Sequence, residues 1–195
     1  MGSNALRTLS AAALLVSAPG VRAAGGTVSG KVDVTPPKYA AETVVYLKGV
    51  AESPQPRTLA MDQKNMTFIP HVLVVAKGDT VKFLNHDGVG HNVYSPDGDA
   101  YNLGTFKQNE DRTHKFDQEG PYSQLCSIHP EMLGYIFVAP SRFAAAVDPK
   151  GRFTIADVPP GSYKLAVWNS HLKAPDQPVT VTAGGTTEVN VTVKR

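Results

Sequence analysis

Short segments with strand-like alternation, separated by turns that carry Gly or Pro, follow one another along most of this chain. Short strands at such even spacing are typical of a Greek-key sandwich or barrel. No segment has helical periodicity over a useful length, and only residues 101–108 could hold a helical turn. The composition agrees, because 42% hydrophobic and 18% charged residues with 17 Gly and 15 Pro suit a turn-rich β protein. We therefore predict an all-β fold.

The predicted strands fall into three groups along the 195 residues. The first group lies in residues 25–50 and the last in 141–195, and residues 51–60, with Pro54 and Pro56, are interpreted as a linker. The middle group, in residues 57–140, contains the predicted strands 66–69, 72–76, 80–84, 112–116, 122–126 and 133–139. These strands are enough for a sandwich of their own.

The single cysteine of the chain, Cys126, lies between two of these strands, and His129 and Met132 follow at three-residue intervals. Thiolate, imidazole and thioether are ligands that copper can use in both of its oxidation states. A blue-copper site needs two His, one Cys and a weak axial Met, and His91, after an apolar strand, is the candidate for the missing histidine. Each residue alone has an ordinary interpretation as core or surface. The combination predicts a copper site.

Residues 57–140 resemble the cupredoxins, the small blue-copper proteins, and the loop Cys126-Ser-Ile-His129-Pro-Glu-Met132 is similar to the short ligand loop of the amicyanin type. This resemblance implies one type 1 copper site. His91, Cys126 and His129 would be its strong ligands and Met132 its axial ligand. It also implies a one-electron carrier that uses Cu(I) and Cu(II).

Asn92 matches the Asn that follows the first His in that family, where it ties the two ligand loops together and points its N–H at the cysteine sulfur. One departure from the family pattern is Glu131, a carboxylate inside the ligand loop. His86, five residues before His91, is the alternative first ligand.

The flanking segments resemble a carboxypeptidase-regulatory-like, or transthyretin-like, β-sandwich. The likeness rests on Gly26-Thr-Val-Ser-Gly-Lys-Val32 and Val45-Tyr-Leu-Lys-Gly49 in the first segment, and on Val158-Pro-Pro-Gly-Ser-Tyr-Lys-Leu165 in the last. A lone hairpin in residues 25–50 is not stable by itself, and the C-terminal strands need partners. We therefore expect the copper domain, 57–140, to be inserted into a sandwich made of 25–50 and 141–195. The alternative is that residues 25–50 extend the copper domain's own sheet.

The first 24 residues are interpreted as a signal peptide, with Arg7 before an apolar run too short to cross a bilayer and small residues near Ala23. The alternative is a disordered or tagged N-terminus. Removing Arg7 and Arg22 from the 19 basic residues leaves 17, equal to the 17 acidic residues. We therefore expect an exported or periplasmic protein with no transmembrane segment and no nucleic-acid or anionic-membrane partner. One unpaired cysteine in an exported protein is best explained by metal ligation.

These observations favour a soluble electron carrier. A four-ligand copper site leaves no open position for a substrate, so we do not expect an enzyme. We expect a monomer whose redox partner protein docks near His129, on an apolar surface to which Pro70, Pro130 and Leu133 could contribute. Two alternatives remain: a copper-holding or copper-delivery protein with the same ligands, and an interaction module in which the metal is structural.

Overall fold

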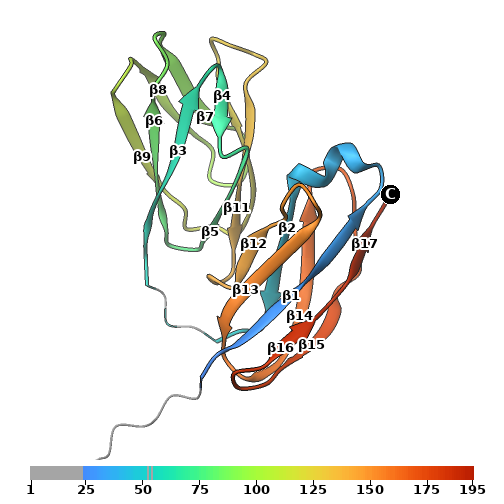
Figure 1. Cartoon of the computed structure of the whole chain (residues 1–195). Coiled ribbons are helices and arrows are strands. Elements are labelled where there is room, and N and C mark those ends of the chain that lie inside the picture. The colour runs from blue at the N-terminus through green and yellow to red at the C-terminus, as the bar shows by residue number, and fades with distance from the viewer. Residues whose placement is uncertain (1–23, 52, 54) are drawn as a thin grey trace, which may run out of the picture.

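The computed structural model describes residues 24–51, 53 and 55–195, so the expected signal peptide lies outside the described residues except for Ala24. The described chain is built almost wholly of strands, which confirms the all-β prediction (Figure 1). The elements are β1 Gly26–Val34, η1 Pro37–Glu42, β2 Thr43–Lys48, β3 Thr58–Lys64, β4 Thr67–Ile69, β5 Val72–Ala76, β6 Thr80–Asn85, β7 His91–Ser95, β8 Tyr101–Phe106, β9 Asp111–Lys115, β10 Gly120–Leu125, β11 Leu133–Ala139, β12 Ala144–Ala146, β13 Arg152–Val158, β14 Gly161–Asn169, β15 Gln177–Val181, β16 Thr186–Glu188 and β17 Val191–Val193.

Strands β3 to β11 form two sheets that face each other. We call them the metal-segment sandwich, because they contain the residues predicted to bind copper, and we call the apolar cluster between them the metal-segment core. One, the β3 sheet, has the order β4-β3-β6-β9, and the other, the β11 sheet, has the order β5-β11-β10-β7-β8. Their inner faces enclose an apolar core that includes Phe83, Phe116, Tyr122 and Ile136. Cys126 and Met132 belong to the same core, at its edge near the ligand loop.

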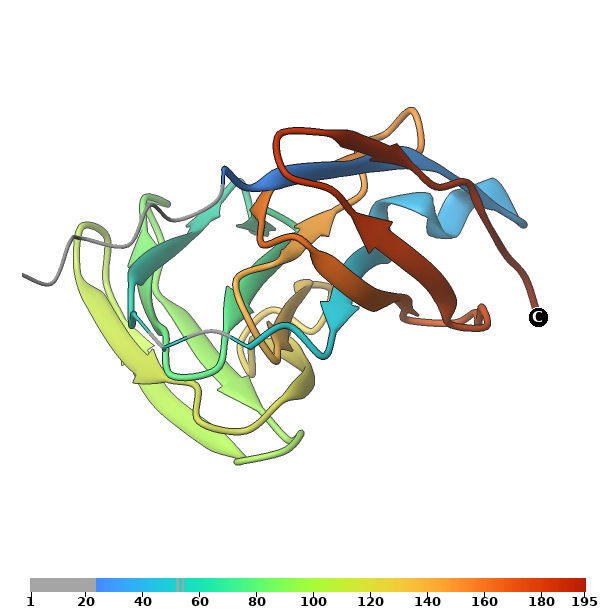
Figure 2. The ribbon, with the colours of Figure 1, turned by 90° about the horizontal axis from the view of Figure 1, so that it is seen from below.

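The remaining strands form the second sandwich. The β1 sheet joins β13, β1, β16 and β17, and the β2 sheet has the order β12-β2-β14-β15. Strands β1 and β2 thus pair with strands from the far end of the chain, while β3 to β11 lie between them in sequence. In the described chain, residues 25–50 do not extend the sheets of the middle segment, and β1 and β2 pair only with strands that follow that segment in sequence (Figures 1 and 2).

The two sandwiches share a third apolar cluster between the β11 sheet and the β2 sheet. Alternation along β11 explains it, because Ile136 and Val138 point into the metal-segment core while Tyr135 and Phe137 point to the other side. There they meet residues of the second sandwich, among them Trp168. Since both faces of β11 are covered, its sequence is a nearly continuous apolar run.

Three expectations about individual elements were wrong. Residues 101–106 form strand β8 and not a helical turn, because they pair with β7. Strand β3 lies where the linker was expected to continue, and it pairs in parallel with β6. His91 was expected directly after an apolar strand, but residues 86–90 separate it from β6, and it opens β7 opposite Phe106. In each case pairing with another strand, which the pattern of one segment does not encode, decides the structure.

Candidate metal centre

His91, Cys126 and His129 come together at one end of the metal-segment sandwich, with ligand atoms within 4.8 Å of one another. The two histidine Nδ1 atoms lie 3.0 Å apart, and the Sγ atom of Cys126 lies 3.8 Å from Nδ1 of His129. His91 is supplied by the start of β7, and the other two by the connection between β10 and β11. Three residues that the sequence singled out as strong ligands therefore lie together.

Donor type and orientation both fit a copper ion. Each imidazole turns Nδ1 toward the other, and the thiol of Cys126 is the soft donor that copper accepts in either oxidation state. Nε2 of His91 is already engaged, because it donates to a carboxylate oxygen of Asp87 at 2.7 Å. That bond fixes the tautomer and leaves Nδ1 of His91 as the nitrogen free to bind a metal.

The centre is shielded from water on one side and reaches the surface on the other. His91 is fully buried and Cys126 is 3% exposed, whereas His129 is only partly buried. Ile128 and Leu133, on either side of His129, are among the large exposed apolar side chains of the described chain, together with Val89 near His91. His129 is therefore the least buried of the three candidate ligands, and exposed apolar side chains lie near it in the sequence.

Asn92 holds the two ligand segments together. Its backbone N–H donates to Sγ of Cys126 at 3.4 Å, and its side-chain Oδ1 accepts from the N–H of Ser127 at 3.3 Å. The side-chain amide also donates to Asn102 on β8. These contacts agree with the role that the cupredoxin resemblance implies for Asn92.

Met132 is 1% exposed and lies in the same apolar cluster as Cys126. Its N–H donates to the carbonyl of His129 at 3.0 Å, which closes the turn at the end of the ligand loop. Glu131, the departure from the family pattern, is exposed to solvent.

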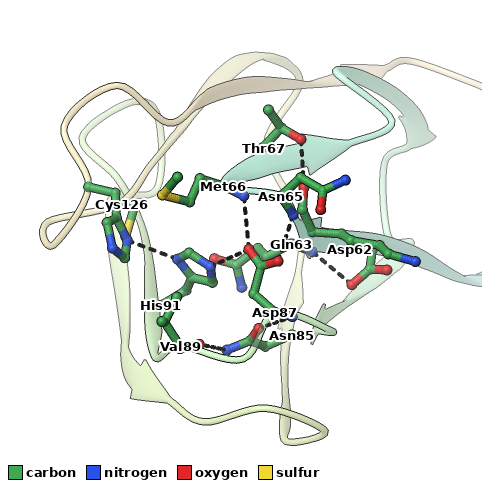
Figure 3. A network of polar contacts seen from close by, with 12 residues as sticks. Asp62, Gln63, Asn65, Met66, Thr67, Asn85, Asp87, Val89, His91 and Cys126 are labelled. Carbon is green, nitrogen blue, oxygen red and sulfur yellow. Dashed lines mark hydrogen bonds and ion pairs between the residues drawn. The ribbon is translucent and has the colours of Figure 1, made fainter.

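Asp87 and Asn85 are functional residues that sequence reasoning missed. The Asp87 carboxylate accepts from His91 and from the backbone N–H groups of Asn65 and Met66 (Figure 3). Burial by itself would raise the pKa of Asp87, but the hydrogen bonds from Met66, His91 and Asn65 lower it below the ordinary value. Asn85 donates to the carbonyls of Val89 and Phe106, and so fixes the loop that precedes His91. The available signal was the spacing of Asp87, four residues before His91.

The other histidines lie away from this cluster. His86, the alternative first ligand, is half exposed and pairs with Asp62 at 2.7 Å. His71 and His171 flank the carboxylate of Glu42, at 3.5 and 3.7 Å. His114 stacks on the ring of Tyr101, and burial lowers its pKa.

Comparison with known families gives two partial matches. Residues 57–139 match the family of copper binding proteins of the plastocyanin/azurin type. Residues 139–189 match domain II of polysaccharide lyase family 4. The carboxypeptidase-regulatory-like resemblance of the second sandwich thus remains an expectation. No match was found among curated protein sequences.

Several solved structures are similar over part of the chain. A purple cupredoxin from Nitrosopumilus maritimus is 27% identical over 41% of this chain and 98% of its own, with a TM-score of 0.38. A copper-containing nitrite reductase from Thermus scotoductus SA-01 is 28% identical over 45% of this chain and 23% of its own, with a TM-score of 0.40. The reduced Cu(I) form of an amicyanin mutant is 25% identical over 48% of this chain and 97% of its own, with a TM-score of 0.40.

The family match covers the segment that contains the His91–Cys126–His129 cluster. In the described part of the chain, no helix is long and apolar enough to span a membrane. The family match and the cluster together support a copper-binding protein.

Proposed function

We propose that this chain is an exported type 1 copper protein that carries single electrons. The observation that carries the proposal is the convergence of two imidazole Nδ1 atoms and one thiol at the end of a sandwich that matches a copper-binding family. His91, Cys126 and His129 would hold the ion, with Met132 as the axial thioether. When bound, copper supplies a one-electron couple between Cu(I) and Cu(II).

The protein's own contribution is to hold the ligands still. Asp87 fixes the ring of His91, and Asn92 directs its N–H at the cysteine sulfur and ties the ligand loop to β7. A ligand set held by such outer contacts changes little when the charge of the metal changes, which favours fast electron exchange. Four protein ligands also leave no position for a substrate, so we propose a carrier and not an enzyme.

The partner would be a redox protein that docks where His129 reaches the surface. Ile128, Leu133 and Val89 give this end exposed apolar area, which can pack against a partner and exclude water between the two centres. Export to the periplasm and a monomeric state remain parts of this proposal, as does a carboxypeptidase-regulatory-like, or transthyretin-like, fold for the second sandwich. A copper-delivery protein is the second candidate, because the partly exposed His129 would also let a partner reach the ion.

The test of the site is the visible absorption spectrum of the oxidised, copper-loaded protein. An intense band from thiolate-to-copper charge transfer is expected, and Cys126→Ser is expected to abolish it because serine offers no soft thiolate. Ser127→Ala, which changes a neighbouring hydroxyl and keeps the thiolate, should retain the band. A band that persists in Cys126→Ser would exclude Cys126 as a ligand.

The first histidine is tested in the same way. His91→Ala should remove or strongly alter the band, whereas His86→Ala should leave it unchanged, because His86 pairs with Asp62 outside the cluster. The opposite pattern would reassign the ligand.

The carrier and delivery functions are distinguished by measuring the exchange of Cu(I) with a chelator. A delivery protein gives up Cu(I) readily to the chelator, whereas a carrier retains it through repeated redox cycles.

A further inference from the structure

The turn between β3 and β4 has an unusual residue at its second position. Asn65 and Met66 both have left-handed backbones, with φ of 53° and 54°. Two-residue hairpin loops of this kind favour Asn-Gly, because glycine adopts positive φ without steric cost. A methionine at the glycine position is strained, and such strain is retained where the surrounding structure enforces it.

Asp87 enforces this turn and connects it to the metal centre. Its carboxylate accepts from the N–H of Asn65 at 2.6 Å and of Met66 at 2.9 Å, as well as from His91 at 2.7 Å. The turn is therefore fixed against a predicted copper ligand by one partly buried carboxylate. In Figure 3 the Met66 side chain leaves the turn toward His91 and Cys126, with its sulfur on the side of the cluster.

Met66 also differs from the other described methionines in its exposure. It is 47% exposed, whereas Met61 and Met132 are buried at 0% and 1%. Met61 and Met132 both belong to the buried apolar cluster, while Met66 is exposed and its side chain extends toward the His91 and Cys126 side of Figure 3. Any aliphatic side chain at position 66 would cover apolar surface, but the thioether of methionine also offers a soft donor to a metal.

We propose that Met66 is an entry ligand that captures Cu(I) at the surface and speeds its incorporation into the centre. This rests on the proposed copper site. Thioether sulfur binds Cu(I) in preference to Cu(II), so the effect is confined to the reduced ion. The ion keeps its charge throughout: the bond to Met66 is exchanged for bonds to the buried ligands, and the Cys126 thiol releases its proton to solvent.

The test is the rate of copper uptake by the full-length apo-protein. Cu(I) is supplied without oxygen from a coloured chelator whose bleaching reports transfer, and Cu(II) uptake is followed by growth of the visible band. Met66→Leu keeps apolar volume and removes the sulfur, so it should slow Cu(I) uptake about fivefold or more and leave Cu(II) uptake and the final band unchanged. Met61→Leu, a buried control, should alter neither rate.

A backbone effect is separated by Met66→Gly, which relieves the left-handed strain and also lacks sulfur. It should slow Cu(I) uptake as much as Met66→Leu does. Unchanged Cu(I) uptake in Met66→Leu, or equal slowing of Cu(I) and Cu(II), would overturn the proposal. Failure of the type 1 site shows itself separately: a wild-type protein without the visible band, whose Cu(I) uptake still depends on Met66, would refute that site and support the entry ligand.

Discussion

Asp87 determines how His91 is presented at the candidate metal centre. Its side chain is 13% exposed and accepts three hydrogen bonds, so the carboxylate stays charged next to a fully buried imidazole. The pair of His86 and Asp62 has the same chemistry, but its side chains are 48% and 24% exposed. Exposed pairs contribute little, so the two His–Asp pairs form a natural comparison.

Asp87→Asn is expected to raise the reduction potential of the copper-loaded protein. The carboxylate makes His91 a stronger donor and adds negative charge, and both effects favour Cu(II) over Cu(I). A tenfold change in the equilibrium constant of a one-electron couple corresponds to about 59 mV, and we expect a shift of about this size. Voltammetry measures it, with Asp62→Asn as the matched control. An unchanged or lowered potential in Asp87→Asn would contradict the assigned role.

The sequence reveals some of these residues and hides others. Cys126, His129 and Met132 lie within seven residues, so their spacing alone predicts a ligand loop. The contact of Asp87 with Asn65 and Met66 spans more than twenty residues and depends on the pairing of β3 with β6. A local pattern contains no such information.

The β5–β6 turn has its own organising carboxylate, that of Asp79. Its side chain is 2% exposed. It accepts from the backbone N–H groups of Arg57 and Ala76 and from the Arg57 guanidinium at 2.6 Å. Burial by itself would raise the pKa of Asp79, but the guanidinium and the backbone donors lower it below the ordinary value. The turn thereby fixes the point where the chain enters the metal-segment sandwich.

Asp79→Asn is expected to lower the free energy of unfolding by about 1–3 kcal/mol at neutral pH, because it removes a charge that satisfies buried donors. Since the folded pKa lies below the unfolded value of about 3.9, this stabilisation is present above that pH. It is lost as pH falls through the folded pKa. Urea unfolding at neutral and acid pH should therefore show a smaller acid destabilisation in the variant than in wild type. An identical pH dependence would show that Asp79 contributes nothing.

Strands whose alternation follows from one buried face could be predicted, and β1, β5, β6 and β11 lie close to the expected residues. Strand β8 was missed because its residues alternate weakly, with glycine at position 104 in a left-handed conformation. Strand β3 was missed because it follows a Pro-containing linker. Both strands are defined by their neighbours, β7 and β6.

At the scale of the whole molecule, four sheets are stacked through three apolar clusters. The middle cluster joins the two sandwiches and includes Tyr135 and Phe137 from β11. From sequence alone these two residues would be assigned to the core of the copper domain. The structure instead uses them to attach that domain to its neighbour, so residues 57–140 in isolation would expose an apolar face.

The single tryptophan gives a direct test of this attachment. The ring of Trp168 stacks on Phe137 with centroids 5.4 Å apart and meets the edge of Tyr135 at 5.5 Å. Such aromatic pairs contribute about 0.5–1.5 kcal/mol each beyond the area they bury.

We expect wild type to unfold in one calorimetric transition, because the two sandwiches stabilise each other across this cluster. Trp168→Ala should separate it into two, with the visible copper band lost in only one of them. Leu165→Ala, on the opposite face of β14 in the core of the second sandwich, should lower stability without uncoupling the metal segment through this interface. A single transition in Trp168→Ala, or two transitions already in wild type, would show that the cluster does not couple the sandwiches.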